Sequence, residues 1–434
     1  MKVTVIGAGL AGCEAAYQLA KRRIEVALYE MRPKKLTPAH SGGGFAELVC
    51  SNSLRSDRLE NAAGLLKAEL RKLDSVIMSA ADACAVPAGG ALAVDRESFS
   101  AKVKEILLSF DNIEFVNEEV DKIPDGNVII AAGPLCSDAL ADAIKEKTGE
   151  DYCHFFDAAA PIVTKDSIDM NIAFTASRYD RGDDYINCPM TKDEYENFVS
   201  ELLNAEVAPV HGFEGQVFEG CMPVEVMAAR GMQTLAFGPC KPVGLVDPGT
   251  GETPYACVQL RRDDARDTLY NIVGFQTHLK FGEQKRVFSM IPGLENCEIV
   301  RYGVMHRNTF LCSPRLLDYT YSLKSDPRIK FAGQITGVEG YIESTASGFT
   351  AGVSMAEELS NREITDFTSL TATGALGHYI SSGSGRNFQP MNINFGIIDP
   401  PEERINGGKQ ARYEYVAKRA LKKIDELKER IIWD

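Results

Sequence analysis

The chain has 434 residues, of which 44% are hydrophobic and 25% charged, and its formal net charge is -14. This length exceeds the roughly 250–300 residues at which one hydrophobic core stops growing, so we expect two domains or a large insertion. No apolar run approaches the roughly 18–20 residues of a membrane span and the first residues lack a secretory pattern, so we expect a cytoplasmic protein without a membrane partner.

The N-terminal segment predicts a dinucleotide-binding unit. Residues 2–6 form a β-branched apolar run, GAGLAG follows at positions 7–12, and an alanine-rich stretch suited to a helix comes next. In this motif the first glycine allows the tight turn, the second lets the backbone approach a pyrophosphate, and the third lets the helix pack on the strand. The predicted contacts are Gly7, Ala8, Gly9, Leu10, Ala11 and Gly12. A second strand, 25–29, ends at Glu30, whose carboxylate can accept hydrogen bonds from ribose hydroxyls.

Cys50 is the first candidate for covalent chemistry. It follows a glycine run in SGGGFAELVCSNSLRS and has Asn52, Ser53 and Arg55 beside it. The eleven cysteines show no CxxC pairs or Cys/His clusters, which argues against a disulfide framework and a structural metal site. A buried cysteine is usually a small apolar filler, so the polar neighbours are what favour a chemical role here.

The middle of the chain is predicted to be an insertion. A third strand, 127–131, ends in AAGP with Gly133, whose small residues let backbone lie against a dinucleotide. Proline- and acid-rich segments at 178–192 and 292–298 suggest the limits of the insertion. Within it we predict a helix over 191–203, and strands or connections over 216–223 and 234–237. Cys221 lies in FEGCMPVEVMAARG, a turn before a probable helix whose N-terminus would lower the pKa of a thiol.

The later segments add polar groups and a second glycine-rich strand. RYGVMHRNTF contains His306 and Arg307, which suit a pterin or a base edge, although a lone histidine on a strand is more often structural. RIKFAGQITGVEGYIESTASGFTAG gives a strand, a helix and the glycines Gly333, Gly337 and Gly340. In FAD-binding folds the chain often returns to the first domain in this way, so we expect FAD. Because the sequence has one complete glycine fingerprint, we expect no second domain for a nicotinamide, and NADPH or NADH would visit the flavin transiently.

The last predicted helix, 408–431, is basic. It holds eight Lys and Arg residues between Lys409 and Arg430, so it is either a solvated surface helix or one that faces RNA, although the net charge disfavours nucleic acid. The predicted fold class is α/β: a Rossmann-type, glutathione-reductase-like FAD-binding domain, residues 1–180 and 301–434, interrupted by a smaller α+β insertion domain, residues 181–300.

Seven segments spread over nearly the whole chain resemble the folate- and FAD-dependent tRNA (uracil-5-)-methyltransferases of bacteria: MKVTVIGAGLAGCEAAYQLA, SGGGFAELVCSNSLRS, EGCMPVEVMAARG, GPCKPVGL, RYGVMHRNTF, GQITGVEGYIES and MNINFG. The resemblance implies methylation of C5 of the T-loop uridine (uridine-54) of tRNA. The carbon would come from 5,10-methylenetetrahydrofolate and the hydride from FAD that NADPH or NADH has reduced. No obligate protein partner is implied.

The resemblance also assigns residues. Cys50 and Cys221 match the two cysteines considered functional in the family, Tyr341 would stack on flavin or base, and Lys409 and Arg412 would contact the tRNA T-arm. A cysteine makes chemical sense because uracil C5 is a poor nucleophile until a thiolate has added at C6.

Three rival functions remain compatible with the residues. A wobble-uridine modification flavoprotein would usually have a large additional C-terminal helical domain. A small-molecule NAD(P)H-dependent FAD oxidoreductase would suit the negative charge and would not need Cys50. An FAD-stabilised RNA-binding protein without turnover would tolerate loss of both cysteines.

Overall fold

One mainly parallel sheet carries the N-terminus of the chain. The computed structural model describes residues 1–37, 39–40, 42–150, 152–208, 222–383, 385 and 388–431, without the side chains of 153–157, 306 and 307. The strand order of this sheet is β16-β17-β7-β1-β2-β6, and every neighbouring pair is parallel except β16 and β17. The strands are β1 (Lys2–Ile6), β2 (Glu25–Tyr29), β6 (Ile113–Val116), β7 (Asn127–Ile130), β16 (Ser322–Leu323) and β17 (Asp326–Phe331).

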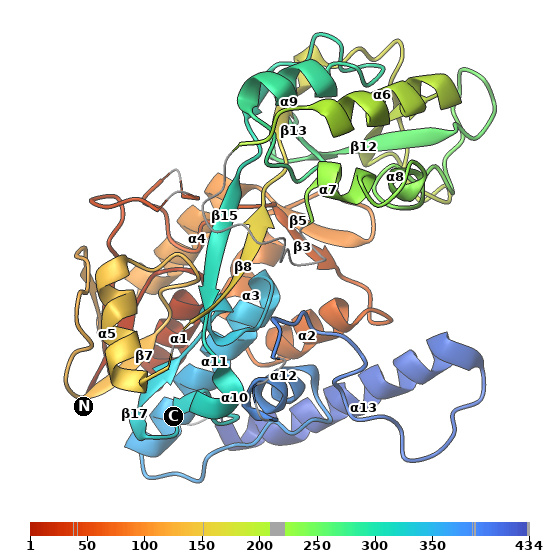
Figure 1. Cartoon of the computed structure of the whole chain (residues 1–434). Coiled ribbons are helices and arrows are strands. Elements are labelled where there is room, and N and C mark those ends of the chain that lie inside the picture. The colour runs from red at the N-terminus through yellow and green to blue at the C-terminus, as the bar shows by residue number, and fades with distance from the viewer. Residues whose placement is uncertain are drawn as a thin grey trace.

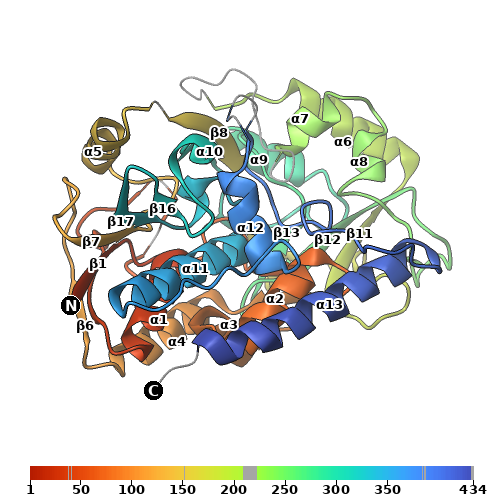
Figure 2. The ribbon, with the colours of Figure 1, turned by 90° about the horizontal axis from the view of Figure 1, so that it is seen from below.

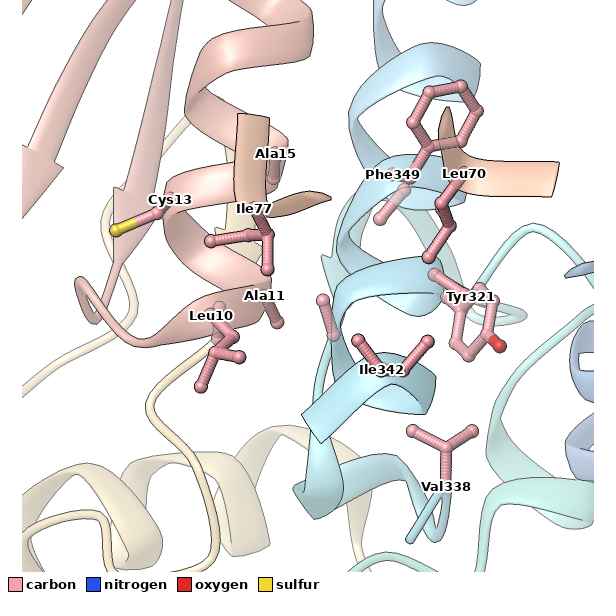
Figure 3. Close-up of a cluster of buried hydrophobic side chains, with 14 of the residues drawn as sticks. Leu10, Ala11, Cys13, Ala15, Leu70, Ile77, Tyr321, Val338, Ile342 and Phe349 are labelled. Carbon is pink, nitrogen blue, oxygen red and sulfur yellow. The ribbon is translucent and has the colours of Figure 1, made fainter. Parts of the chain in front are cut away.

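Two helices that are far apart in sequence pack closely beside this sheet. They are α1 (Leu10–Lys21) and α11 (Tyr341–Leu359), and Figure 3 shows Ala11 and Ala15 of α1 facing α11 across a buried apolar cluster. A Cβ atom on Gly348 would lie 2.1 Å from the carbonyl oxygen of Ala11. Glycine at this position therefore sets how closely the two helices approach.

A second sheet is antiparallel and has its own core. Its order is β10-β11-β12-β13-β9-β14, and the buried residues of this core run from Val163 to Cys297. The first core draws on residues before and after this stretch. The elements of the second part are β9 (Ile162–Thr164), the 3-10 helix η1 (Lys165–Ser167), β10 (Phe174–Thr175), β11 (Tyr185–Met190), α6 (Lys192–Asn204), α7 (Val224–Ala228), α8 (Thr234–Phe237), β12 (Ala256–Arg262), β13 (Leu269–Ile272), α9 (Phe281–Phe288) and β14 (Ile299–Arg301).

A two-stranded ribbon connects the two parts. Strands β8 (Cys153–Ala158) and β15 (Met305–Phe310) pair antiparallel, with Ala158 opposite Met305, and Figure 1 shows them running between the lower body and the upper part that contains α6 and α9. A small sheet lies near the junction: β3 (Ser53–Ser56), β5 (Ala91–Val94) and β4 (Ala85–Val86). The predicted division at residues 181 and 300 stays a prediction.

The remaining helices surround the first sheet. The C-terminal helix α13 (Gly408–Ile431) lies alongside α2 (Ala62–Lys72), as Figure 2 shows from below. No helix of the described residues is long and apolar enough to span a bilayer. The remaining elements are α2 (Ala62–Lys72), α3 (Val76–Ala83), α4 (Arg96–Leu108), α5 (Asp138–Thr148), α10 (Ser313–Leu316), the 3-10 helix η3 (Gln334–Thr336), α12 (Ala372–Ser381) and α13 (Gly408–Ile431).

The secondary-structure predictions have mixed outcomes. The strands at 2–6 and 25–29 and the helix at 408–431 are confirmed, and the strand at 127–131 and the helix at 191–203 are confirmed to within one residue at each end. The strand or connection at 234–237 is wrong, because these residues form the short helix α8, which buries Leu235 and Ala236 in the second core. Four residues are too few for periodicity to separate helix from strand. Most of the segment 216–223 lies outside the described residues.

Candidate active site

The glycine turn after β1 forms one wall of a cavity. Gly7 has a φ of +101°, and a Cβ atom there would lie 2.5 Å from the carbonyl oxygen of Ala131. A Cβ atom on Gly12 would lie 1.8 Å from the carbonyl oxygen of Gly7, so the turn and the first turn of α1 fit only without side chains. No side chain caps α1 at Gly9. The backbone N–H groups of a helix N-terminus are unsatisfied by the helix and attract anions.

The cavity extends from this turn over the carboxyl ends of the parallel strands. It holds about 1240 Å³ of space, its open mouth included. The predicted residues that line it are Gly7, Gly9, Leu10, Ala11, Glu30, Cys50, Gly133, Gly333 and Tyr341. Segments distant in sequence therefore meet where open α/β sheets bind their ligands.

Four predicted cofactor contacts shape the backbone behind this surface and are not among the lining residues. Ala8 and Gly12 are buried in the turn. A Cβ atom on Gly337 would lie 2.5 Å from the Phe388 ring, and one on Gly340 would lie 2.3 Å from Oε2 of Glu343. Both glycines have positive φ angles, so they allow the chain to turn into α11.

Glu30 lies at the cavity wall with its carboxylate engaged by neighbours. Oε2 accepts hydrogen bonds from the backbone N–H of Ala8 at 2.9 Å and from Nη2 of Arg32 at 2.9 Å. Burial raises the pKa of Glu30, but the bonds and charge of Arg32 outweigh it and hold the pKa below its ordinary value. Glu30 is therefore ionised at neutral pH, and Arg32, which also lines the cavity, is fixed by it.

Cys50 also lines the cavity, where it lies against the hydroxyl of Tyr341, the first residue of α11. The Sγ of Cys50 is 3.1 Å from this hydroxyl oxygen, which also accepts hydrogen bonds from the backbone N–H groups of Cys50 at 2.9 Å and Ser51 at 3.3 Å. Burial, followed by the nearby Cys50, raises the pKa of Tyr341 well above its ordinary value. The tyrosine thus keeps its proton and fixes the backbone of the cysteine.

Another cysteine on the cavity wall differs in character. Burial raises the pKa of Cys136 to about 11, so its thiol is protonated at neutral pH and is a poor nucleophile. Among the described residues, no group of three or more His, Cys, Asp or Glu side chains could hold a metal ion.

Of the other predicted site residues, Lys409 and Arg412 are not among those that line this cavity. Cys221 lies outside the described residues, and His306 and Arg307 occupy β15 with side chains that are not described. Lys409 and Arg412 lie in the first turns of α13, each 5.4 Å from the centroid of the Tyr413 ring. That ring stacks on Phe395 with centroids 4.0 Å apart. The two cations therefore belong to a separate aromatic and basic cluster.

Comparison with known proteins identifies the family. The sequence model of the family described as "Glucose inhibited division protein A" matches residues 2–363. Proteins named "Methylenetetrahydrofolate--tRNA-(uracil-5-)-methyltransferase TrmFO" are similar over nearly the full length. The one from Bacillus cytotoxicus is 61% identical over 424 residues, 97% of this chain and 98% of the relative. The one from Acetivibrio thermocellus is 61% identical over 427 residues, 98% of each chain.

The chain belongs to the TrmFO family. The resemblance inferred from the seven sequence segments is therefore confirmed. The solved structure of Aquifex aeolicus GidA in its form I crystal matches with a TM-score of 0.72 at 16% identity, covering 100% of this chain and 76% of that one. This likeness confirms the predicted α/β fold class of the TrmFO chain.

Sequence reasoning missed several residues of the site. Arg32 follows Glu30 by two positions, and such a pairing at a strand end is a signal that could have been found. Arg96 and Arg261 also contact the segment around Cys50, but they come from α4 and β12. No local pattern indicates contacts between elements so far apart in the chain.

Proposed function

We propose that this protein methylates C5 of the T-loop uridine of tRNA with the one-carbon unit of 5,10-methylenetetrahydrofolate. The names of the relatives at 61% identity support the tRNA, the uracil C5 position and the folate. The observation that carries the proposal is the position of Cys50, whose thiol lies at the wall of the dinucleotide cavity and against Tyr341. An oxidoreductase that passes hydride directly between a nicotinamide, flavin and a small molecule would not need such a thiol.

The cavity fits FAD. Gly9 and Gly133 would each present no obstruction even with a Cβ atom, and the uncapped N-terminus of α1 suits a pyrophosphate. Once NADPH or NADH has reduced it, bound flavin would supply the hydride that brings a methylene carbon to the methyl level. We assign cofactor contacts to the predicted residues that line the cavity, and backbone-shaping roles to Ala8, Gly12, Gly337 and Gly340.

The covalent step falls to the cysteines. A thiolate adds to uracil C6, which makes C5 nucleophilic, and C5 then forms a bond to the methylene carbon as the bond between that carbon and one folate nitrogen breaks. A base removes the C5 proton and the second bond between the carbon and folate breaks. A hydride, which reduced flavin would supply, then completes the methyl group as the thiolate leaves C6. We propose Cys50 and Cys221 as the pair that supplies the nucleophile and its assisting group, with Tyr341 holding Cys50 in place.

The tRNA contacts are proposed for β15 and the start of α13. His306 and Arg307 lie within β15 of the ribbon. Two other ribbon residues, Ala158 and Asn308, line the cavity, so we assign His306 and Arg307 to substrate. Lys409 and Arg412 flank an aromatic ring, an arrangement that suits stacking and phosphate contacts with RNA. The target uridine must leave its stack to reach the thiol, at a cost of a few kcal/mol, and such contacts offset it.

The test is a turnover experiment with nucleoside analysis. The flavin-loaded protein is incubated with unmodified tRNA, methylenetetrahydrofolate labelled at the methylene carbon, and NADPH or NADH. Labelled 5-methyluridine at the T-loop position is expected, together with its loss in Cys50→Ala protein that keeps bound FAD. Flavin reduction without labelled nucleoside would instead favour the NAD(P)H-dependent oxidoreductase acting on a small molecule.

A further inference from the structure

Arginines from other elements hold the backbone on the N-terminal side of Cys50. Nη1 of Arg96, at the start of α4, donates to the carbonyl oxygen of Leu48. Nη2 of Arg301, at the end of β14, donates to the carbonyl oxygen of Val49 at 2.6 Å. Neither arginine is near Cys50 in sequence, so the fold brings both charges to this segment.

A third arginine holds the other side of the cysteine. Arg261, near the end of β12, donates from Nη2 to Oγ of Ser51 at 2.7 Å and from Nε to Oδ1 of Asn52 at 3.2 Å. The amide of Asn52 in turn donates to the carbonyl oxygen of Arg262 at 3.0 Å. We call Arg96, Arg261 and Arg301 the arginine clamp, because together they contact the two residues on each side of Cys50.

Within the described part of the chain, one carboxylate forms an ion pair with the clamp. Asp263 forms an ion pair with Arg96 at 3.1 Å, and Glu47, the other nearby carboxylate, pairs with Arg32 at 2.9 Å. Tyr341, which faces Cys50 from α11, is neutral at ordinary pH. Three guanidinium groups therefore hold this segment, and among the described ion pairs Arg96 is the one that has a carboxylate partner, Asp263.

Electrostatic coupling links Arg96 and Arg261 to the thiol, and links Arg301 to Arg96. Burial lowers the pKa of Arg261 and of Arg301, and the charge of Arg96 lowers both further, which shows that the guanidinium groups lie close enough to repel one another. Negative charge on Cys50 acts in the opposite direction on Arg96 and Arg261. Such coupling is reciprocal, so the same cations favour the thiolate over the thiol.

We propose that Arg96, Arg261 and Arg301 are positioning residues that hold the Cys50 segment and stabilise its thiolate. Since Arg261 and Arg301 belong to the second sheet, the reactivity of Cys50 depends on that sheet being docked against the first part of the chain. A second contact supports this docking: the backbone N–H of Ala265 donates to Asp95 at 2.8 Å, one residue before Arg96. The inference rests on the role proposed for Cys50 in methyl transfer.

The test measures the thiol directly. The flavin-loaded full chain is alkylated with iodoacetamide between pH 5 and 10, and the rate at Cys50 is read by mass spectrometry from the tryptic peptide 36–55, whose one cysteine is Cys50. Removing one nearby charge in Arg261→Gln or Arg301→Gln should raise the pH midpoint by about one unit. The fraction of thiolate at pH 7 would then fall up to about tenfold, but a more basic thiolate is also more nucleophilic. The alkylation rate at pH 7 should therefore fall roughly three- to tenfold.

Two variants control for a merely structural effect. Arg262→Gln changes the next residue of β12, whose guanidinium pairs with Asp267 at 2.9 Å, and its alkylation profile should match that of the unmodified protein. Arg261→Lys retains a charge and should recover most of the rate. An unchanged midpoint in both glutamine variants, or an equal shift in Arg262→Gln, would overturn the proposal.

The outcome is independent of the proposed function, because alkylation requires neither tRNA nor folate. A shifted midpoint combined with full methyl transfer by Cys50→Ala would leave the arginine clamp standing and refute the catalytic role of the cysteine. An unchanged midpoint combined with lost methyl transfer in Cys50→Ala would refute the arginine clamp and leave the catalytic role of the cysteine standing.

Discussion

Replacing Gly348 by alanine tests whether the approach of α11 to α1 supports the cofactor site. The new Cβ atom would lie 2.1 Å from the carbonyl oxygen of Ala11 and 2.7 Å from its Cα, roughly 1 Å short of any tolerable distance to the oxygen. The two helices must separate, which costs about 1–3 kcal/mol, while alanine returns up to about 1 kcal/mol of helix propensity. We expect a net loss of roughly 1–2 kcal/mol.

The loss should be visible in both stability and cofactor content. Ala11 lies one position after Leu10, and both line the cavity, so a shifted α1 should lower the melting temperature by a few degrees and weaken FAD retention. Gly282 in α9 is the matched control, because a Cβ atom there meets nothing within 4 Å, and Gly282→Ala should be neutral or slightly stabilising. If Gly348→Ala melts at or above the original temperature with full FAD content, the packing argument is wrong.

Three further predictions concern buried polar groups. Tyr341→Phe removes the acceptor of two backbone N–H groups, and each buried N–H left without a partner costs about 1–3 kcal/mol. The rate of methyl transfer should therefore fall at least about tenfold, while the flavin spectrum stays unchanged. An undiminished kcat would contradict the positioning role of Tyr341. Burial raises the pKa of Glu69 to about 7, above its unfolded value, so its contribution to stability should decline as pH rises from about 4.5 to 7. Urea unfolding at pH 5 and pH 7.5 should therefore show a weaker pH dependence in Glu69→Gln, and equal slopes would refute this. Lys67 donates from Nζ to the carbonyl oxygens of Leu54 and Ser56 at 2.9 and 2.6 Å. Lys67→Met should therefore lower the free energy of unfolding in urea by on the order of 2–3 kcal/mol. An unchanged urea midpoint would show that water replaces the ammonium group.

Local patterns predicted those parts of the fold whose cause is local. The strand 2–6, its glycine turn and the helix after it form a continuous unit in which each residue type has a steric role, and Gly7 and Gly12 occupy the positions that exclude a Cβ atom. The basic helix 408–431 was likewise predicted from its composition and matches α13 residue for residue. The prediction for the short segment 234–237 was wrong: its four residues carry too little local pattern, and they form a helix that buries Leu235.

Contacts between distant segments account for what sequence could not provide. Cys50 was predicted from its polar neighbours, but its bond to Tyr341 spans 291 positions. The clamp arginine Arg261 lies 210 positions from Ser51, in a strand that reads as an ordinary part of an antiparallel sheet. Charge around a thiol depends on which elements dock against it, and a single sequence does not specify docking.

The strand order also determines when the protein can bind its cofactor during synthesis. β7 pairs with β17, and roughly 200 residues separate these neighbours in the chain, so at about 5–20 residues per second the ribosome needs roughly 10–40 s between them. The second core, from Val163 to Cys297, is complete before β17 emerges. Until β17 emerges, one edge of β7 has no partner strand. Gly333 and Tyr341, which line the cavity, follow later still, so flavin uptake is one of the last events in the maturation of the nascent chain.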